Sequence, residues 1–283
     1  MIASFKELYA ASYAHAKGLY KTFLLGTIVL VLLQIATRFG GAVFFGLGSL
    51  LFQHSQSLIG GTFFVIGAAF YIATFVVQLV STAFVVVLTV EGVKAVKPML
   101  RRSFDLCVKV LLCGMWIILR TYSWVGFIGF LMLAASKTFE VQFVGVALIV
   151  LGMVLAFIFI PRLSFTTIVL VREKKGVLES AKLSMKYTEG YWGKIVGNYL
   201  LLAIIVFGIS VGGFFVAALP AILGSMNTNA FSLSSIILFA VSGLLLFAFV
   251  FLMMFVTLWT RAFTVSLYET IKQHPKAVTS ARS

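Results

Sequence analysis

Residues 141–161 read VQFVGVALIVLGMVLAFIFIP, a run of apolar side chains that contains no charged residue. A hydrocarbon core of about 30 Å needs roughly 20 apolar residues per helix, so this stretch is long enough to cross a bilayer. Backbone groups in hydrocarbon must form their hydrogen bonds internally, which leaves helices or a closed barrel. Because the run is longer than a barrel strand of about ten alternating residues, it predicts a transmembrane helix.

Similar runs recur along the whole chain. The 283 residues are 61% hydrophobic and 11% charged, whereas soluble domains are roughly a quarter charged. We expect an all-α integral membrane protein with about six transmembrane helices, at residues 20–38, 58–84, 104–120, 141–161, 195–213 and 232–257. Three shorter apolar stretches fall short of a full crossing and are expected to be helix extensions, re-entrant segments or interfacial helices, at 42–52, 126–135 and 214–223.

The distribution of charge predicts the orientation. Charged residues gather in four stretches that share one side of the membrane if the chain has six spans, at 6–21, 91–109, 172–194 and 261–282. Of the 22 Lys and Arg residues, only Arg38, Arg120 and Lys137 lie in or beside the opposite loops. The positive-inside rule therefore places the charged side and both termini in the cytoplasm. The net charge of +14 then points to anionic lipid headgroups, and not to nucleic acid, because no basic domain or base-stacking platform accompanies it.

The chain also reads as a repeat. We expect one polytopic domain at 1–271, made of three parts at about 1–93, 94–173 and 174–271, followed by a cytoplasmic tail at 272–283. Each part has a charged amphipathic stretch, a span, a short apolar piece, a polar tip and a longer span, which predicts three helical pairs. Residues of the first part recur in the third at a constant offset: Glu7, Ser12, Gly18 and Tyr20 as Glu179, Ser184, Gly190 and Trp192. In the middle part, Ser103 has neither the glycine nor the aromatic at those spacings, so the match there rests on layout alone. Similar closing segments begin at Phe84, Phe165 and Phe263.

Amphipathic helices are expected at the cytoplasmic interface. Ser4 followed by Glu7 fits a capping box, and aromatic and apolar residues then follow helical spacing, which predicts a short interfacial helix. The later counterpart places four charged residues on one face, Glu179, Lys182, Lys186 and Glu189, and four apolar residues on another, Val177, Leu178, Ala181 and Met185. The charged face is interpreted as solvated; the alternative is a binding face for lipid or a cytoplasmic protein.

Residues 181–197 read AKLSMKYTEGYWGKIVG and contain the pattern Ala-x-x-Ser followed by Gly-x-aromatic at the entrance to a span, formed by Ala181, Ser184, Gly190, Trp192 and Gly197. This pattern resembles the signature of a bacterial and archaeal multipass family: the membrane domain fused to some glycerophosphodiester phosphodiesterases, with related stand-alone proteins of unknown function. The resemblance implies about six helical spans and a bacterial inner-membrane location. Phosphodiesterase activity is not carried over, because the chain has neither the catalytic barrel nor its acidic and histidine residues.

Within that pattern the roles are structural. Gly190 can end a helix, since glycine adopts left-handed backbone angles without a Cβ clash. Trp192 suits the aromatic belt of the membrane and Lys194 the headgroups. The small-xxx-small pairs Gly193–Gly197 and Gly208–Gly212 are compatible with close helix contacts, including those of a homo-oligomer.

Basic side chains at the ends of apolar runs are the candidate lipid or ion contacts: Arg162, Arg261, Lys182, Lys186 and Lys194. Snorkelling to headgroups accounts for Arg162 and Arg261, and a buried ion or lipid-phosphate site is the alternative. Pro161 and Pro220 are expected to kink or interrupt their helices. Catalytic residues, cofactors and metals are not expected. No two of the eight acidic residues form a pair within an apolar run, and the three histidines lie in different segments.

The sequence thus predicts a non-enzymatic multipass membrane protein, with a role in envelope or lipid homeostasis or as a scaffold. The alternative is a transporter or channel for a small or amphiphilic solute, which the repeat and the proline breaks would suit. A water-filled cavity lined by residues such as Gln78, Arg120, Glu140, Arg162 or Arg261 would favour transport. A dry, close-packed interior would favour the non-enzymatic membrane protein without a transport function.

Overall fold

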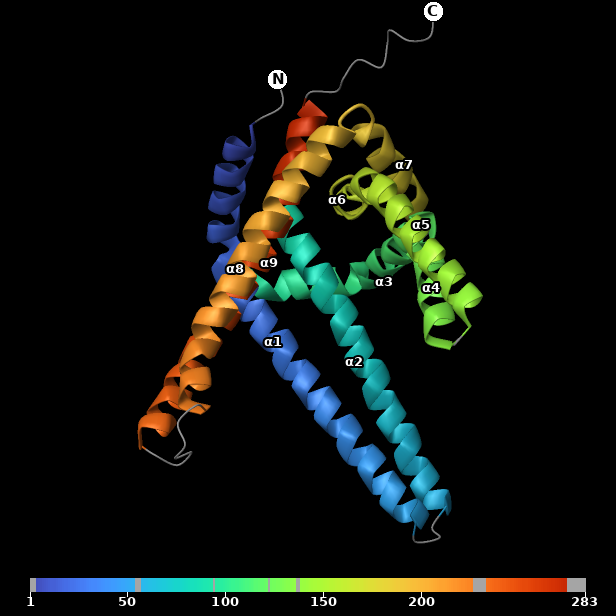
Figure 1. The fold of residues 1–283 in the computed structure, drawn as a ribbon, viewed down its shortest axis with the longest axis vertical. Coiled ribbons are helices and arrows are strands. Elements are labelled where there is room, and N and C mark those ends of the chain that lie inside the picture. The colour runs from blue at the N-terminus through green and yellow to red at the C-terminus, as the bar shows by residue number, and fades with distance from the viewer. Residues whose placement is uncertain are drawn as a thin grey trace, which may run out of the picture. The chain divides into compact units, whose positions relative to one another are not determined.

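The computed structural model describes residues 4–53, 57–93, 95–121, 123–135, 138–225 and 233–273. Regular structure in these ranges is entirely helical (Figure 1), which confirms the predicted helical class. The helices are α1 (Phe5–Gln53), α2 (Ser57–Glu91), α3 (Val96–Arg120), α4 (Ser123–Ala135), α5 (Phe139–Leu163), α6 (Thr166–Arg172), α7 (Val177–Thr188), α8 (Trp192–Ser225) and α9 (Leu233–Gln273). Lys137 and the part of the predicted tail beyond Gln273 lie outside the described residues.

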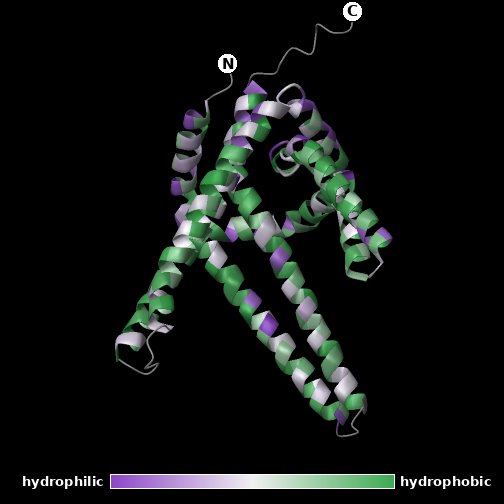
Figure 2. Cartoon of the chain, viewed as in Figure 1, coloured by the Kyte–Doolittle hydropathy of each residue, from purple (hydrophilic) through white to green (hydrophobic). Residues whose placement is uncertain are grey.

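Five apolar helical segments are long enough to cross a membrane: α1, Leu58–Glu91 of α2, Phe139–Arg172 of α5 and α6, α8 and α9. A sixth crossing follows if α3 and α4, which are bent by 71° relative to each other, form one broken span. Hydrophobic residues dominate these helices in Figure 2. The described residues therefore contain five or six helices of spanning length, as the sequence predicted.

The three short apolar stretches differ in what they form. Residues 42–52 continue α1 and residues 214–223 continue α8, so both are helix extensions. Residues 126–135 instead belong to α4, a separate helix. Pro220 lies inside α8 without ending it, and Pro161 lies close to the end of α5.

The expected short helix at the start of the chain is absorbed into α1. The capping box is present, since the Ser4 N–H donates to Glu7 Oε2 at 2.7 Å and the Glu7 N–H donates to Ser4 Oγ at 3.3 Å. The helix then runs on through Gly18 into the span. At the later counterpart, Gly190 takes a φ of 74° and separates α7 from α8, as predicted.

Contacts divide the chain into two compact units, and Met1–Tyr20 with Lys186–Ser283 forms the first. In this unit α8 packs against α9, where Ser242 Oγ donates to the Ala217 carbonyl at 2.7 Å. The first turns of α1 also pack on α9, through ring pairs in antiparallel order, Phe5 with Phe263, Tyr9 with Trp259 and Tyr13 with Phe255. The two ends of the described chain are therefore packed together.

Lys21–Met185 forms the second unit. Here α1 and α2 run side by side in opposite directions (Figure 1). Gly48 of α1 lies close to Gly60 of α2, so a Cβ added to either glycine would come near the carbonyl oxygen of the other. The backbones of α4 and α5 lie close together at Gly129 and Gly145 and again at Gly126 and Gly152. Helix α2 also contacts α3 and α6. Small residues thus let backbones approach where helices pack in this unit.

Three serines occupy equivalent buried positions. Ser12, Ser103 and Ser184 are each 0% exposed. Each has a buried residue one turn before it and another one turn after it: Leu8 and Ala16, Met99 and Cys107, Ser180 and Thr188. The aromatic residues that open the closing segments, Phe84, Phe165 and Phe263, are also 0% exposed. The middle part therefore shares a burial pattern with the others, although the three helical pairs and the repeat boundaries stay predictions.

Candidate functional site

All five predicted basic contact residues are exposed. Lys182 and Lys186 lie on α7, Arg162 in the last turn of α5, Lys194 in the first turn of α8, and Arg261 in α9 beyond its apolar run. Glu179 and Glu189 are exposed as well, with Glu179 on α7 and Glu189 in the turn that follows it. None of the five basic residues lines the cavity between α1 and α2 or the cleft where α2, α3 and α6 meet.

The buried face of α7 differs from the expected one. Leu178 is exposed, and the face that packs is made of small residues, Ser180, Ala181, Ser184 and Thr188. Ser184 Oγ donates to the Arg162 carbonyl at 2.8 Å, which ties α7 to the end of α5. Ala181 and Ser184 of the predicted motif are therefore packing residues, because larger side chains would hold α7 away.

The predicted glycine pairs do not lie at helix contacts. A Cβ added at Gly193, Gly197, Gly208 or Gly212 would meet nothing within 4 Å. Trp192 is the first residue of α8 and is half-buried. Close backbone approaches occur instead at glycines that spacing had not singled out, among them Gly48, Gly60, Gly129, Gly145 and Gly152.

A cavity of about 180 Å³ between α1 and α2 contains Gln78, one of the residues named for a transport pathway. Gln34 Nε2 donates to Gln78 Oε1, and Thr74 Oγ1 donates to Thr37 Oγ1 at 2.9 Å nearby. Thr27 and Ser81 also line the cavity, but Arg120, Glu140, Arg162 and Arg261 do not. Transport therefore stays an alternative, and of its five named residues only Gln78 lines this cavity.

A second cavity was missed by sequence reasoning. It is an open cleft of about 470 Å³ where α2 ends, α3 passes and α6 ends, lined by Val90, Glu91, Arg102, Val171, Arg172 and Lys174. Its four charged residues come from two of the charged stretches, 91–109 and 172–194. The pattern of charge in the sequence does not predict that residues of these two stretches line the same cleft.

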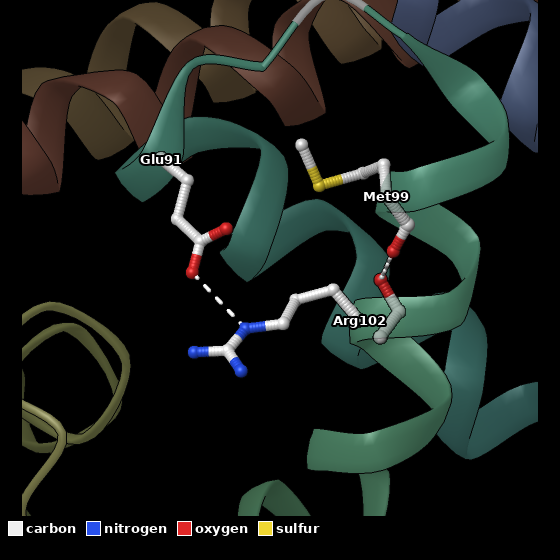
Figure 3. Close-up of polar contacts among 4 residues, drawn as sticks. Glu91, Met99 and Arg102 are labelled. Atoms are coloured by element: carbon white, nitrogen blue, oxygen red, sulfur yellow. Dashed lines mark hydrogen bonds and ion pairs between the residues drawn. The ribbon is translucent and has the colours of Figure 1, made fainter.

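One wall of the cleft is an ion pair between α2 and α3 (Figure 3). Glu91 ends α2, and Arg102 Nε donates to its Oε1 at 3.3 Å. Met99 and Ser103 are buried, and Ser103 Oγ donates to the Met99 carbonyl at 2.7 Å. Because this buried stripe fixes the rotation of α3, Arg102 is held at its edge with 38% of its side chain exposed.

The other wall is the end of α6. This helix is almost entirely buried, from Thr166 to Val171, and its last residue is Arg172. Lys174 follows with a φ of 53°, which among the described residues is the one positive φ outside glycine. The cleft thus brings together three cationic side chains and one carboxylate, a set suited to binding an anion and not to holding a metal.

Among the described residues, no group of three or more His, Cys, Asp and Glu side chains is placed to hold a metal ion. Cys107 and Cys113 are both buried and unpaired with each other. Comparison of the chain with protein-family models, with curated proteins and with solved structures finds no match. The resemblance given by residues 181–197 stays a prediction.

Proposed function

We propose that the chain is a non-catalytic multipass membrane protein that binds anionic lipid headgroups through its exposed basic residues and acts in envelope or lipid homeostasis or as a scaffold. The observation that supports this proposal is the exposure of all five predicted basic contact residues, Arg162, Lys182, Lys186, Lys194 and Arg261. A basic residue near an anionic membrane surface contributes about 1 kcal/mol of attraction. The bacterial inner membrane is proposed from the family resemblance.

The proposed orientation has six spans and both termini in the cytoplasm. A fusion of alkaline phosphatase, which is active only outside the cytoplasm, to the C-terminus is expected to be inactive. A fluorescent protein that folds only in the cytoplasm is expected to be bright at the same place. The opposite pair of results would reverse the orientation and contradict the assignment of the exposed basic residues to cytoplasmic headgroups.

Lipid preference tests the function itself. The chain is reconstituted in mixtures of phosphatidylglycerol and phosphatidylcholine, and quenching of its tryptophan fluorescence by brominated forms of each lipid gives their relative affinities. We expect phosphatidylglycerol to bind more tightly. Replacing Lys182, Lys186, Lys194 and Arg261 by glutamine should remove most of this preference, because each charge contributes about 1 kcal/mol.

The matched control removes negative charges from the same region in place of positive ones. Glu179 is exposed on the same helix as Lys182, and Glu189 is exposed in the turn just after that helix. Replacing both by glutamine should leave the preference unchanged or increase it. Equal affinities of the unaltered chain for the two lipids would refute the proposal.

A further inference from the structure

The cleft where α2, α3 and α6 meet has more positive charge than its helix ends require. A helix C-terminus favours one nearby cation, and Arg172 fills that role for α6. Arg102 lies in the second turn of α3, where the helix dipole gives a cation no benefit, and Lys174 lies beyond α6. The lining of the cleft therefore contains three cationic side chains and one carboxylate.

Arg102 is held in a geometry that leaves most of its guanidinium available. Its ion pair with Glu91 uses Nε alone, at 3.3 Å. The two terminal nitrogens point away from Glu91 in Figure 3 and bond to none of the residues that the structure describes. A guanidinium fixed in this way presents a planar fork of donors that matches two oxygens of a phosphate.

Lys174 occupies a strained backbone position beside that fork. Side chains with a Cβ rarely adopt its φ of 53°. After α2 a glycine takes the same left-handed conformation: Gly92 has a φ of 66° and follows Glu91, as Lys174 follows Glu173. A lysine where glycine would fit without strain places an ammonium at the cleft at a cost in stability.

We infer that this cleft binds the phosphate group of an anionic ligand, namely the headgroup of an anionic lipid. Arg102 holds two phosphate oxygens, Lys174 and Arg172 supply further positive charge, and Glu91 positions Arg102. The inference rests on the proposed function for the placement of the cleft at headgroup level. The same chemistry would also recognise free phosphate, and the experiment separates the two sources.

The test measures ligand binding to the full chain in neutral detergent. The probes are short-chain phosphatidylglycerol, short-chain phosphatidylcholine and inorganic phosphate, each titrated by calorimetry. Loss of one charge-assisted hydrogen-bonding group is expected to weaken phosphatidylglycerol binding by about tenfold in Arg102→Gln. Lys174→Gly is expected to weaken it similarly while keeping or raising the melting temperature, because glycine relieves the strained φ.

Each variant has a neighbour as its control. Arg101 and Lys175 are exposed, carry the same charges and do not line the cleft. Arg101→Gln and Lys175→Gln should therefore bind like the unaltered chain. Because Lys174→Gly does not threaten the fold, reduced binding in it cannot be attributed to unfolding.

The outcomes are distinct. If phosphatidylglycerol alone depends on Arg102 and Lys174, the ligand is a lipid headgroup. If inorganic phosphate binds as tightly with the same dependence, the cleft is a free-phosphate site. If neither probe depends on these residues, or if the control variants bind as weakly as Arg102→Gln, the inference is wrong.

These results are also separable from those of the proposed function. The cleft variants could still show the preference for phosphatidylglycerol in the quenching experiment and yet bind the probes normally. That result would support the proposed function and reject only phosphate binding by the cleft. Phosphate binding that depends on Arg102, without any lipid preference in quenching, would reject the proposed function and keep the cleft.

Discussion

Replacement of Gly129 by alanine is expected to destabilise the chain by about 3 kcal/mol, because overpacking a close helix contact forces backbones apart. A Cβ at this position would lie 2.5 Å from the Gly145 carbonyl oxygen and 2.9 Å from the Ile149 nitrogen. Both are backbone atoms, so no side-chain rotation can relieve the clash. Helices α4 and α5 would have to separate along their contact.

Gly126 provides the matched control one turn away on the same helix. Its added Cβ would find its nearest neighbour, the Gly152 Cα, at 3.8 Å, which is an ordinary contact. Gly126→Ala should therefore be neutral or stabilising, since alanine favours helix over glycine. Unfolding of both variants by denaturing detergent, followed by circular dichroism, compares them. Equal stability of the two would show that α4 and α5 do not pack as described.

Replacement of Trp259 by alanine is expected to cost about 3 kcal/mol, the range found for large-to-small changes at well-packed aromatic residues. Trp259 is 2% exposed, its ring meets Tyr9 edge-on with centroids 5.0 Å apart, and its Nε1 donates to Ser12 Oγ at 3.0 Å. In lipid these contacts matter through packing and hydrogen bonding more than through the hydrophobic effect. The measurement is the same detergent unfolding.

A double-mutant cycle isolates the hydrogen bond within that contact. Trp259→Phe and Ser12→Ala should each cost about 1 kcal/mol, and together less than the sum, because each removes the same bond. Trp124, which is 44% exposed, is the control, and Trp124→Ala should cost little. Additive effects at Ser12 and Trp259 would mean that the first and last described helices do not share this bond.

Much of the helical architecture could be predicted because apolar runs and their length are local properties of the chain. The left-handed turn at Gly190 was predicted for the same reason, since only local backbone angles were involved. Gly18, at the equivalent place in the first part, continues a helix instead. A glycine permits a break without requiring one, so sequence could not separate these two cases.

The candidate site depended on contacts that no local pattern encodes. The glycines with small-xxx-small spacing on α8 have no close neighbours, whereas Gly129 and Gly145 meet although they belong to different helices. The cleft likewise joins Arg102 to Lys174 only because α3 and α6 both pack against α2. Each residue was visible in a charged stretch, but their convergence is a property of tertiary packing.

The packing of α1 against α9 bears on the order in which the protein assembles. Lys21–Met185 is continuous in sequence and can become compact while the ribosome is still translating the remainder. The first turns of α1 must wait, because their partner α9 follows all the other described helices in chain order. During that interval Tyr9 and Ser12 lack their final neighbour, so a chain truncated before α9 would leave its own beginning without a partner and open to quality-control proteases.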